Sequence, residues 1–180
     1  MNFIIAAILA SALLTAVVTD LRARRIHNWL TFPLMLSGFV FHAVVGGPGG
    51  LGFSAAGFGL GLAAMLLPFL LGVMGAGDVK LMAGVGAWVG ASTILAAFLF
   101  TCLAGGVYAL GVLAFHRAAA RQVLLNLKGA FYGFMATRRF NYAPSASAAL
   151  PRLCYGVAIA AGTVAAVGLN LVRTGSVLAQ

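Results

Sequence analysis

Negative charge is almost missing from this sequence: among its 180 residues, only Asp20 and Asp78 are acidic. Charged residues of both signs make up 7% of the chain, against about 25% in soluble proteins, and 63% of its residues are hydrophobic. So few charges cannot cover a water-facing surface, which excludes an ordinary soluble enzyme. We therefore predict an integral membrane protein.

Cysteine is also scarce, with only Cys102 and Cys154, far apart and in apolar surroundings. Their separation excludes a disulfide framework and the paired-cysteine spacing of a metal site. We interpret both as packing residues and expect neither a metal ion nor a cofactor.

Several apolar runs approach the ~20 residues that a helix needs to cross the bilayer, and none shows the alternation of a membrane barrel strand. The expected fold class is an all-α membrane protein, a bundle of about six transmembrane helices in one domain over residues 1–180. The predicted spans lie near residues 3–19, 29–45, 51–74, 78–90, 92–115 and 153–172, the fourth being short.

The net charge of +9 lies in a few loops between the apolar runs, above all in the predicted loop 116–152. With the N-terminus outside, ten of the eleven basic residues fall on the cytoplasmic side, and only Arg173 does not. This distribution follows the positive-inside rule, so the expected partner of the basic residues is the lipid bilayer and not nucleic acid. Binding of anionic lipid or of a partner ATPase by the basic loop is a lesser alternative.

The segment Gly75-Ala76-Gly77-Asp78 interrupts the apolar pattern with a flexible break followed by an acid. Asp20 ends the first predicted span, and the expected topology puts both acids at the cytoplasmic face. Placing an ionisable group at membrane depth costs free energy, so such a group usually indicates a functional site. We predict that Asp20 and Asp78 form one catalytic pair.

Two neighbouring carboxyls are sufficient for peptide hydrolysis. One deprotonates a water molecule while the other protonates the carbonyl oxygen and then the leaving nitrogen, and at ~3 Å separation the two share one proton. Asp78 opens a helix, where negative charge is favoured, and Asp20 ends one, where it is opposed. This predicts Asp78 as base and Asp20 as acid, unless Arg22 or Arg24 reverses the assignment.

Gly75 and Gly77 are expected to adopt positive φ values and to let an extended substrate approach the acid. Lys80 is expected to anchor the chain at the cytoplasmic side, with substrate contact as a lesser possibility.

The run from Gly75 to Leu81, with Asp20 upstream, resembles the type IV prepilin peptidases, which belong to the Gly-x-Gly-Asp aspartyl proteases. The short chain and its final span opening Tyr155-Gly156-Val157 look most like the form that serves tight-adherence (Flp) pili. The resemblance implies an aspartic endopeptidase of the bacterial inner membrane, multi-pass, with Asp20 and Asp78 as catalytic residues. Its implied partners are a prepilin, through its leader and N-terminal hydrophobic helix, and the pilus assembly machinery.

The sequence departs from the family pattern at three places. Nothing matches the N-terminal methyltransferase domain of the long members, so only peptidase activity is expected. His27 and Cys154 stand where the resemblance predicts proline.

Alternatives to the protease remain at this stage. One alternative is a non-catalytic assembly subunit or a proton-relay channel. A relay would normally distribute polar groups through the bilayer, whereas both acids are expected at one face. A serine protease using one of the three histidines lacks the Gly-x-Ser-x-Gly motif. As purely structural groups, Asp20 would pair with an arginine and Asp78 would cap a helix.

Overall fold

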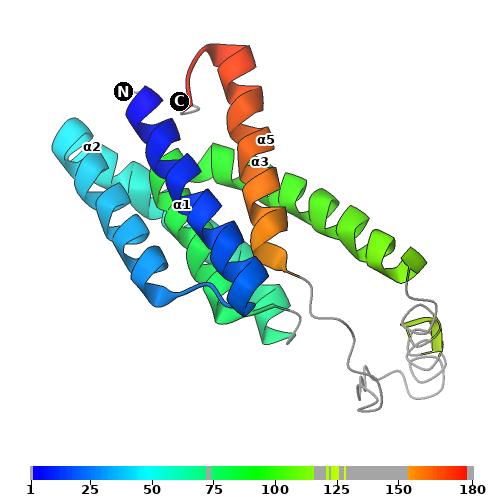
Figure 1. The fold of residues 1–180 in the computed structure, drawn as a ribbon. Coiled ribbons are helices and arrows are strands. Elements are labelled where there is room, and N and C mark those ends of the chain that lie inside the picture. The colour runs from blue at the N-terminus through cyan, green and yellow to red at the C-terminus, as the bar shows by residue number, and fades with distance from the viewer. Residues whose placement is uncertain are drawn as a thin grey trace, which may run out of the picture. The chain divides into compact units, whose positions relative to one another are not determined.

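The computed structural model describes residues 2–71, 74–115, 121, 123–125, 128 and 154–177. The described chain is helical, with α1 Asn2–Ala23, α2 Asn28–Leu70, α3 Ala76–Phe115 and α5 Tyr155–Thr174 (Figure 1). All 4 helices are long and apolar enough to cross a membrane. The predicted all-helical membrane fold is therefore confirmed at this level, whereas the count of six spans and their orientation stay predictions.

The chain divides into two compact units. The first comprises Met1–Gly105 and Cys154–Gln180, and the second comprises Gly106–Leu153. The second unit holds the last residues of α3 and the whole of the predicted basic loop 116–152, which lies almost wholly outside the described residues.

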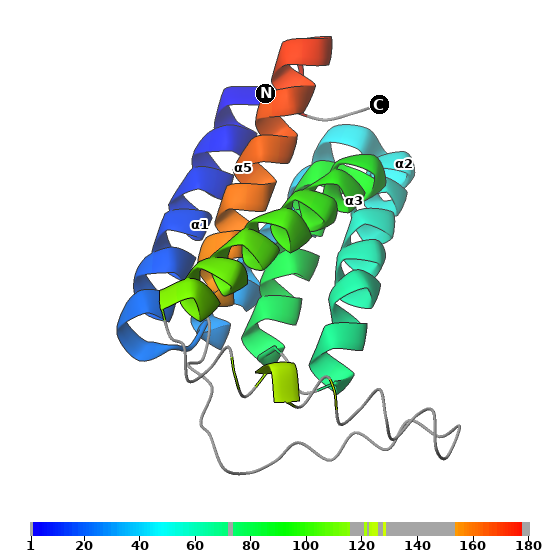
Figure 2. The same ribbon diagram turned by 90° about the vertical axis from the view of Figure 1, so that its right-hand side faces the viewer.

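One glycine breaks each of the two longest helices. In α2, Gly47 has φ 55° and ψ −141°, and in α3, Gly90 has φ 78° and ψ 179°. Such positive φ values are easily reached only by glycine, because it has no Cβ. At Gly47 the chain turns back on itself (Figures 1 and 2). The runs predicted as separate spans therefore lie on either side of these two breaks.

The break at Gly90 frees backbone carbonyls in the interior, and α2 supplies their partners. The hydroxyl of Ser54 donates to Ala87 O at 2.8 Å, and His42 Nε2 donates to Trp88 O at 3.0 Å. Both side chains are buried, where an unpaired carbonyl would cost about 1–3 kcal/mol. His42 therefore has a structural role.

The first part of α3 forms the interior of the unit, and all residues from Leu81 to Gly90 are buried. Small residues bring α2 against it. A Cβ on Gly57 would collide with the Gly86 carbonyl, and one on Gly61 would lie 2.6 Å from Met82 O. These glycines allow the close backbone approach typical of membrane helix pairs.

Two predicted boundaries differ from the structure. The first helix does not end at Asp20 but continues to Ala23, so this acid lies within the last two turns of α1. Among residues 46–50, which separate the predicted spans 29–45 and 51–74, only Gly47 is non-helical. A single glycine with positive φ is thus enough to separate the two parts of α2.

Candidate active site

Both acidic residues line one pocket of about 220 Å³. The pocket is formed by the end of α1, the connection to α2 and the beginning of α3. Its lining residues are Asp20, Arg24, Arg25, Ile26, Gly75, Ala76, Gly77 and Asp78. Two carboxyls that come from different helices thus open on the same small space.

Asp20 is held by the first turn of α5. Its side chain is 6% exposed, and its Oδ2 accepts a hydrogen bond from the backbone N–H of Gly156 at 2.8 Å. The first N–H groups of a helix have no partner within the helix and favour negative charge. This N–H favours negative charge on Asp20 and so opposes the effect of the α1 dipole. The sequence-based assignment of acid and base did not include this donor.

Asp78 is held locally, at the third position of α3. Its Oδ2 accepts the N–H of Gly75 at 3.1 Å, and its own N–H donates to Gly75 O at 3.1 Å. This is the backward half of a capping box, with Gly75 at the N-cap position and Asp78 three residues later. Asp78 therefore fixes the start of α3 as well as lining the pocket.

The two carboxylates and the Cys154 thiol affect one another electrostatically. The carboxylates are close enough for their negative charges to repel one another. Cys154, just before α5, has its Sγ 3.8 Å from Asp20 O. Burial raises the pKa of the Cys154 thiol, the charges of Asp20 and Asp78 raise it further, and Arg24 partly opposes them.

The positive φ predicted for the two motif glycines is wrong, whereas the approach of a substrate to them stays a prediction. The described glycines with positive φ are Gly47, Gly90 and Gly175, and neither Gly75 nor Gly77 is among them. Gly77 is needed for space instead, since a Cβ there would lie 2.9 Å from the Ile26 carbonyl oxygen and 2.9 Å from Ile26 Cβ. Gly75 contributes its N–H to Asp78.

Lys80 points to the start of α2 and is not among the residues that line the pocket. Its Nζ donates to Asn28 Oδ1 at 3.0 Å and lies 5.1 Å from the centre of the Phe32 ring. These contacts join α3 to α2. They give the ammonium a structural role within the unit.

Arg24 has an unusual backbone conformation, with φ 49°. Its N–H donates to Asp20 O at 2.8 Å, which ends α1 with a left-handed residue where glycine is the common choice. A non-glycine residue in this region costs roughly 1–2 kcal/mol. The strain is confined to a residue that lines the pocket beside Asp20.

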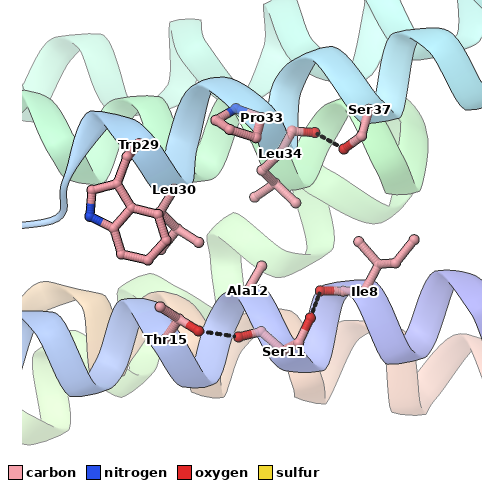
Figure 3. A pocket seen from close by; sticks show the side chains of 9 residues that line it. All are labelled: Ile8, Ser11, Ala12, Thr15, Trp29, Leu30, Pro33, Leu34 and Ser37. Carbon is pink, nitrogen blue, oxygen red and sulfur yellow. Dashed lines mark hydrogen bonds between the residues drawn. The ribbon is translucent and has the colours of Figure 1, made fainter.

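A second pocket of about 300 Å³ lies between α1 and α2 (Figure 3). Its hydroxyls are already bonded within their own helices: Ser11 to Ile8 O, Thr15 to Ser11 O and Ser37 to Leu34 O. No titratable side chain lines this pocket. It offers apolar contact and no acid or base.

Within the described residues, no three His, Cys, Asp or Glu side chains gather as metal ligands.

Sequence reasoning missed the partners that surround Asp20. Gly156 and Cys154 come from the other end of the chain, 136 and 134 positions away. A signal was present, because a glycine in the first turn of an apolar helix exposes backbone N–H groups that suit a carboxylate. Nothing in the sequence indicated which carboxylate they would meet.

A model of the type IV leader peptidase family matches residues 7–110, which include Asp20 and Asp78 and exclude α5. Neither the curated proteins nor the solved structures give a match.

Proposed function

The chain belongs to the type IV leader peptidase family, which makes it a membrane protease acting on prepilin leaders, and we propose that Asp20 and Asp78 are its catalytic pair. The observation that carries the proposal is the shared pocket. The chain has two acidic residues, and both line the same space although they come from different helices.

In the proposed mechanism, a water molecule lies between the two carboxyls. The ionised one takes a proton from this water, which attacks the carbonyl carbon of the scissile peptide bond. The protonated one donates its proton to the carbonyl oxygen, and the resulting diol collapses as the leaving nitrogen is protonated. Two carboxyls sharing one proton supply both functions.

The pocket supports this chemistry through its restraints. Asp20 is tied to Gly156 N–H and Asp78 to Gly75 N–H, so neither carboxyl depends on a flexible side chain for its position. Each recorded bond engages one oxygen, and a carboxylate has about four acceptor sites. Capacity therefore remains for the attacking water.

The finer proposal concerns the substrate and the location. We propose a Flp-like prepilin as substrate, cut at the cytoplasmic face of the bacterial inner membrane before pilus assembly. The opening of the last helix supports the choice of substrate, and the basic loops support the location. Six crossings would follow from the breaks at Gly47 and Gly90. The distribution of basic residues supports an N-terminus on the outer side.

The test is reconstitution of the full chain in liposomes with a synthetic prepilin containing the leader and the N-terminal hydrophobic helix. Mass spectrometry follows the new N-terminus. Asp20→Asn and Asp78→Asn should each lower the cleavage rate by about 10²–10⁴-fold, the range for loss of an acid or base. Arg173→Gln, at the far end of α5, controls for general effects of a charge change.

If both asparagine variants cleave at the wild-type rate, the pair is not catalytic. The substrate proposal is tested separately by comparing, in the same liposomes, a Flp-like prepilin with a prepilin of the long family members. The choice of substrate can be wrong even if Asp20 and Asp78 are catalytic.

A further inference from the structure

The start of α5 makes an unusually close contact with Asp20. α1 and α5 lie side by side in both views of the molecule (Figures 1 and 2). At their common end, Gly156 N lies 2.8 Å from Asp20 Oδ2. Gly156 lies outside the residues that match the family model, 7–110, whereas Asp20 lies within them.

A side chain at position 156 would crowd this contact. A Cβ at position 156 would lie 2.9 Å from Asp20 Oδ2, 3.1 Å from its Cβ and 3.3 Å from its Cγ. Real Cβ atoms essentially never approach closer than 3.0 Å, so either the carboxyl or the helix would have to move. The space that the missing side chain leaves is occupied by the carboxyl group itself.

The hydrogen bond also satisfies a need on the α5 side. Gly156 is the second residue of this helix, so its N–H has no partner within the helix. One residue further, Val157 N–H bonds to Cys154 O at 3.3 Å. Gly156 N–H is buried and depends on Asp20 for its partner.

We infer that Gly156 is a positioning residue for the proposed hydrolysis, setting the place and orientation of the Asp20 carboxyl through its backbone N–H. This inference rests on the proposed function. It assigns the last helix, remote in sequence from the Gly-x-Gly-Asp motif, a part in the reaction. A carboxyl shifted by about 1 Å would lose its alignment with water and peptide, at a cost of up to about 10²-fold in rate.

The test compares three alanine variants along α5. Gly156→Ala disturbs Asp20. Gly162→Ala would collide with Thr101 on α3 and so disturbs packing without touching Asp20, and Gly168→Ala meets nothing within 4 Å. Each variant is purified in the full chain, its unfolding temperature is measured, and kcat and KM are determined across pH.

For Gly156→Ala we expect kcat to fall about tenfold or more with KM changed by less than about twofold, because binding is spared. Its pH profile of kcat should also be displaced by about one unit, the equivalent of a hydrogen bond to a charged group. Gly162→Ala should lower the unfolding temperature and leave the profile in place. Gly168→Ala should match the wild type.

The inference is overturned if Gly156→Ala keeps the wild-type kcat and pH profile, or if it behaves like Gly162→Ala. A wild-type chain that cleaves no prepilin would instead overturn the proposed function. The two failures are therefore distinguishable.

A second measurement covers the case in which Gly156→Ala does not fold. With ¹³C-carbonyl tyrosine and ¹⁵N-glycine, Gly133→Ala leaves Tyr155–Gly156 as the single Tyr–Gly pair in the sequence. Asp20→Asn should then move the amide proton resonance of Gly156, and Asp78→Asn should move it less. An unchanged Gly156 resonance in Asp20→Asn would show that the hydrogen bond is not formed.

Discussion

Replacing Gly77 by alanine tests the wall of the pocket most directly. The added Cβ would lie 2.9 Å from Ile26 O and 2.9 Å from Ile26 Cβ, whereas ordinary contact begins at 3.4 Å. One of the two backbones must therefore move by at least about 0.5 Å, because a carbonyl oxygen cannot rotate away as the end of a side chain can. The segment that moves also lines the pocket of Asp20 and Asp78.

Two opposing effects decide the stability of this variant. Alanine is favoured over glycine in a helix by about 1 kcal/mol, and overpacking typically costs 1–3 kcal/mol. Gly77 lies in the first turn of α3, where the helix preference counts least, so the clash prevails. We expect a net loss of about 1–2 kcal/mol and a fall in cleavage rate of about tenfold or more.

The assay is thermal unfolding in detergent together with cleavage of the synthetic prepilin. Gly59→Ala, with nothing within 4 Å of the new methyl group, is the matched control in α2. Gly75→Ala should lose less than Gly77→Ala, since its Cβ would meet Asp78 Oδ2 at 3.5 Å, an ordinary contact. Equal stability and activity of the Gly77→Ala and Gly59→Ala variants would refute the packing explanation.

Two further predictions concern charge and helix contact. In a Cys102→Ala chain, alkylation of Cys154 should need a pH above that of an ordinary thiol, because burial and both carboxylates raise the pKa of Cys154, and Asp20→Asn should lower that pH. An unchanged alkylation profile in Asp20→Asn would contradict their proximity. Gly57→Ala should lower the unfolding temperature because its methyl group meets a backbone carbonyl of α3, whereas Gly59→Ala should not, and equal temperatures would contradict the close approach.

The fold class followed from composition, since so apolar a chain has few alternatives to membrane helices. The segments on either side of Gly47 and Gly90 were also predictable, because glycines marked the interruptions. Helix ends were not. Asp20 was expected to end α1, and the structure continues the helix to Ala23 and ends it with Arg24 in a left-handed conformation that no residue preference indicated.

The site was predictable only where its contacts are local in the sequence. Gly75 and Asp78 are three residues apart, so their reciprocal hydrogen bonds are a local feature that a motif can record. The part played by Gly77 was misjudged because its neighbour, Ile26, is distant in sequence, and a need for space cannot be distinguished from a need for backbone freedom in one sequence. The role of a glycine such as Gly77 therefore depends on residues that are distant from it in the sequence.

The way in which the two acids are held bears on how such a pair can work near a membrane. Pairing Asp20 with an arginine would place a full positive charge beside it and favour its ionised form. The structure uses one backbone N–H for each acid instead, from Gly156 and from Gly75. A backbone donor orients a carboxyl without adding a full positive charge, which suits the proton exchange that the proposed mechanism requires. Glycine suits both positions because the donor must come close to the acid, and at Gly156 any side chain would occupy the space of the carboxyl.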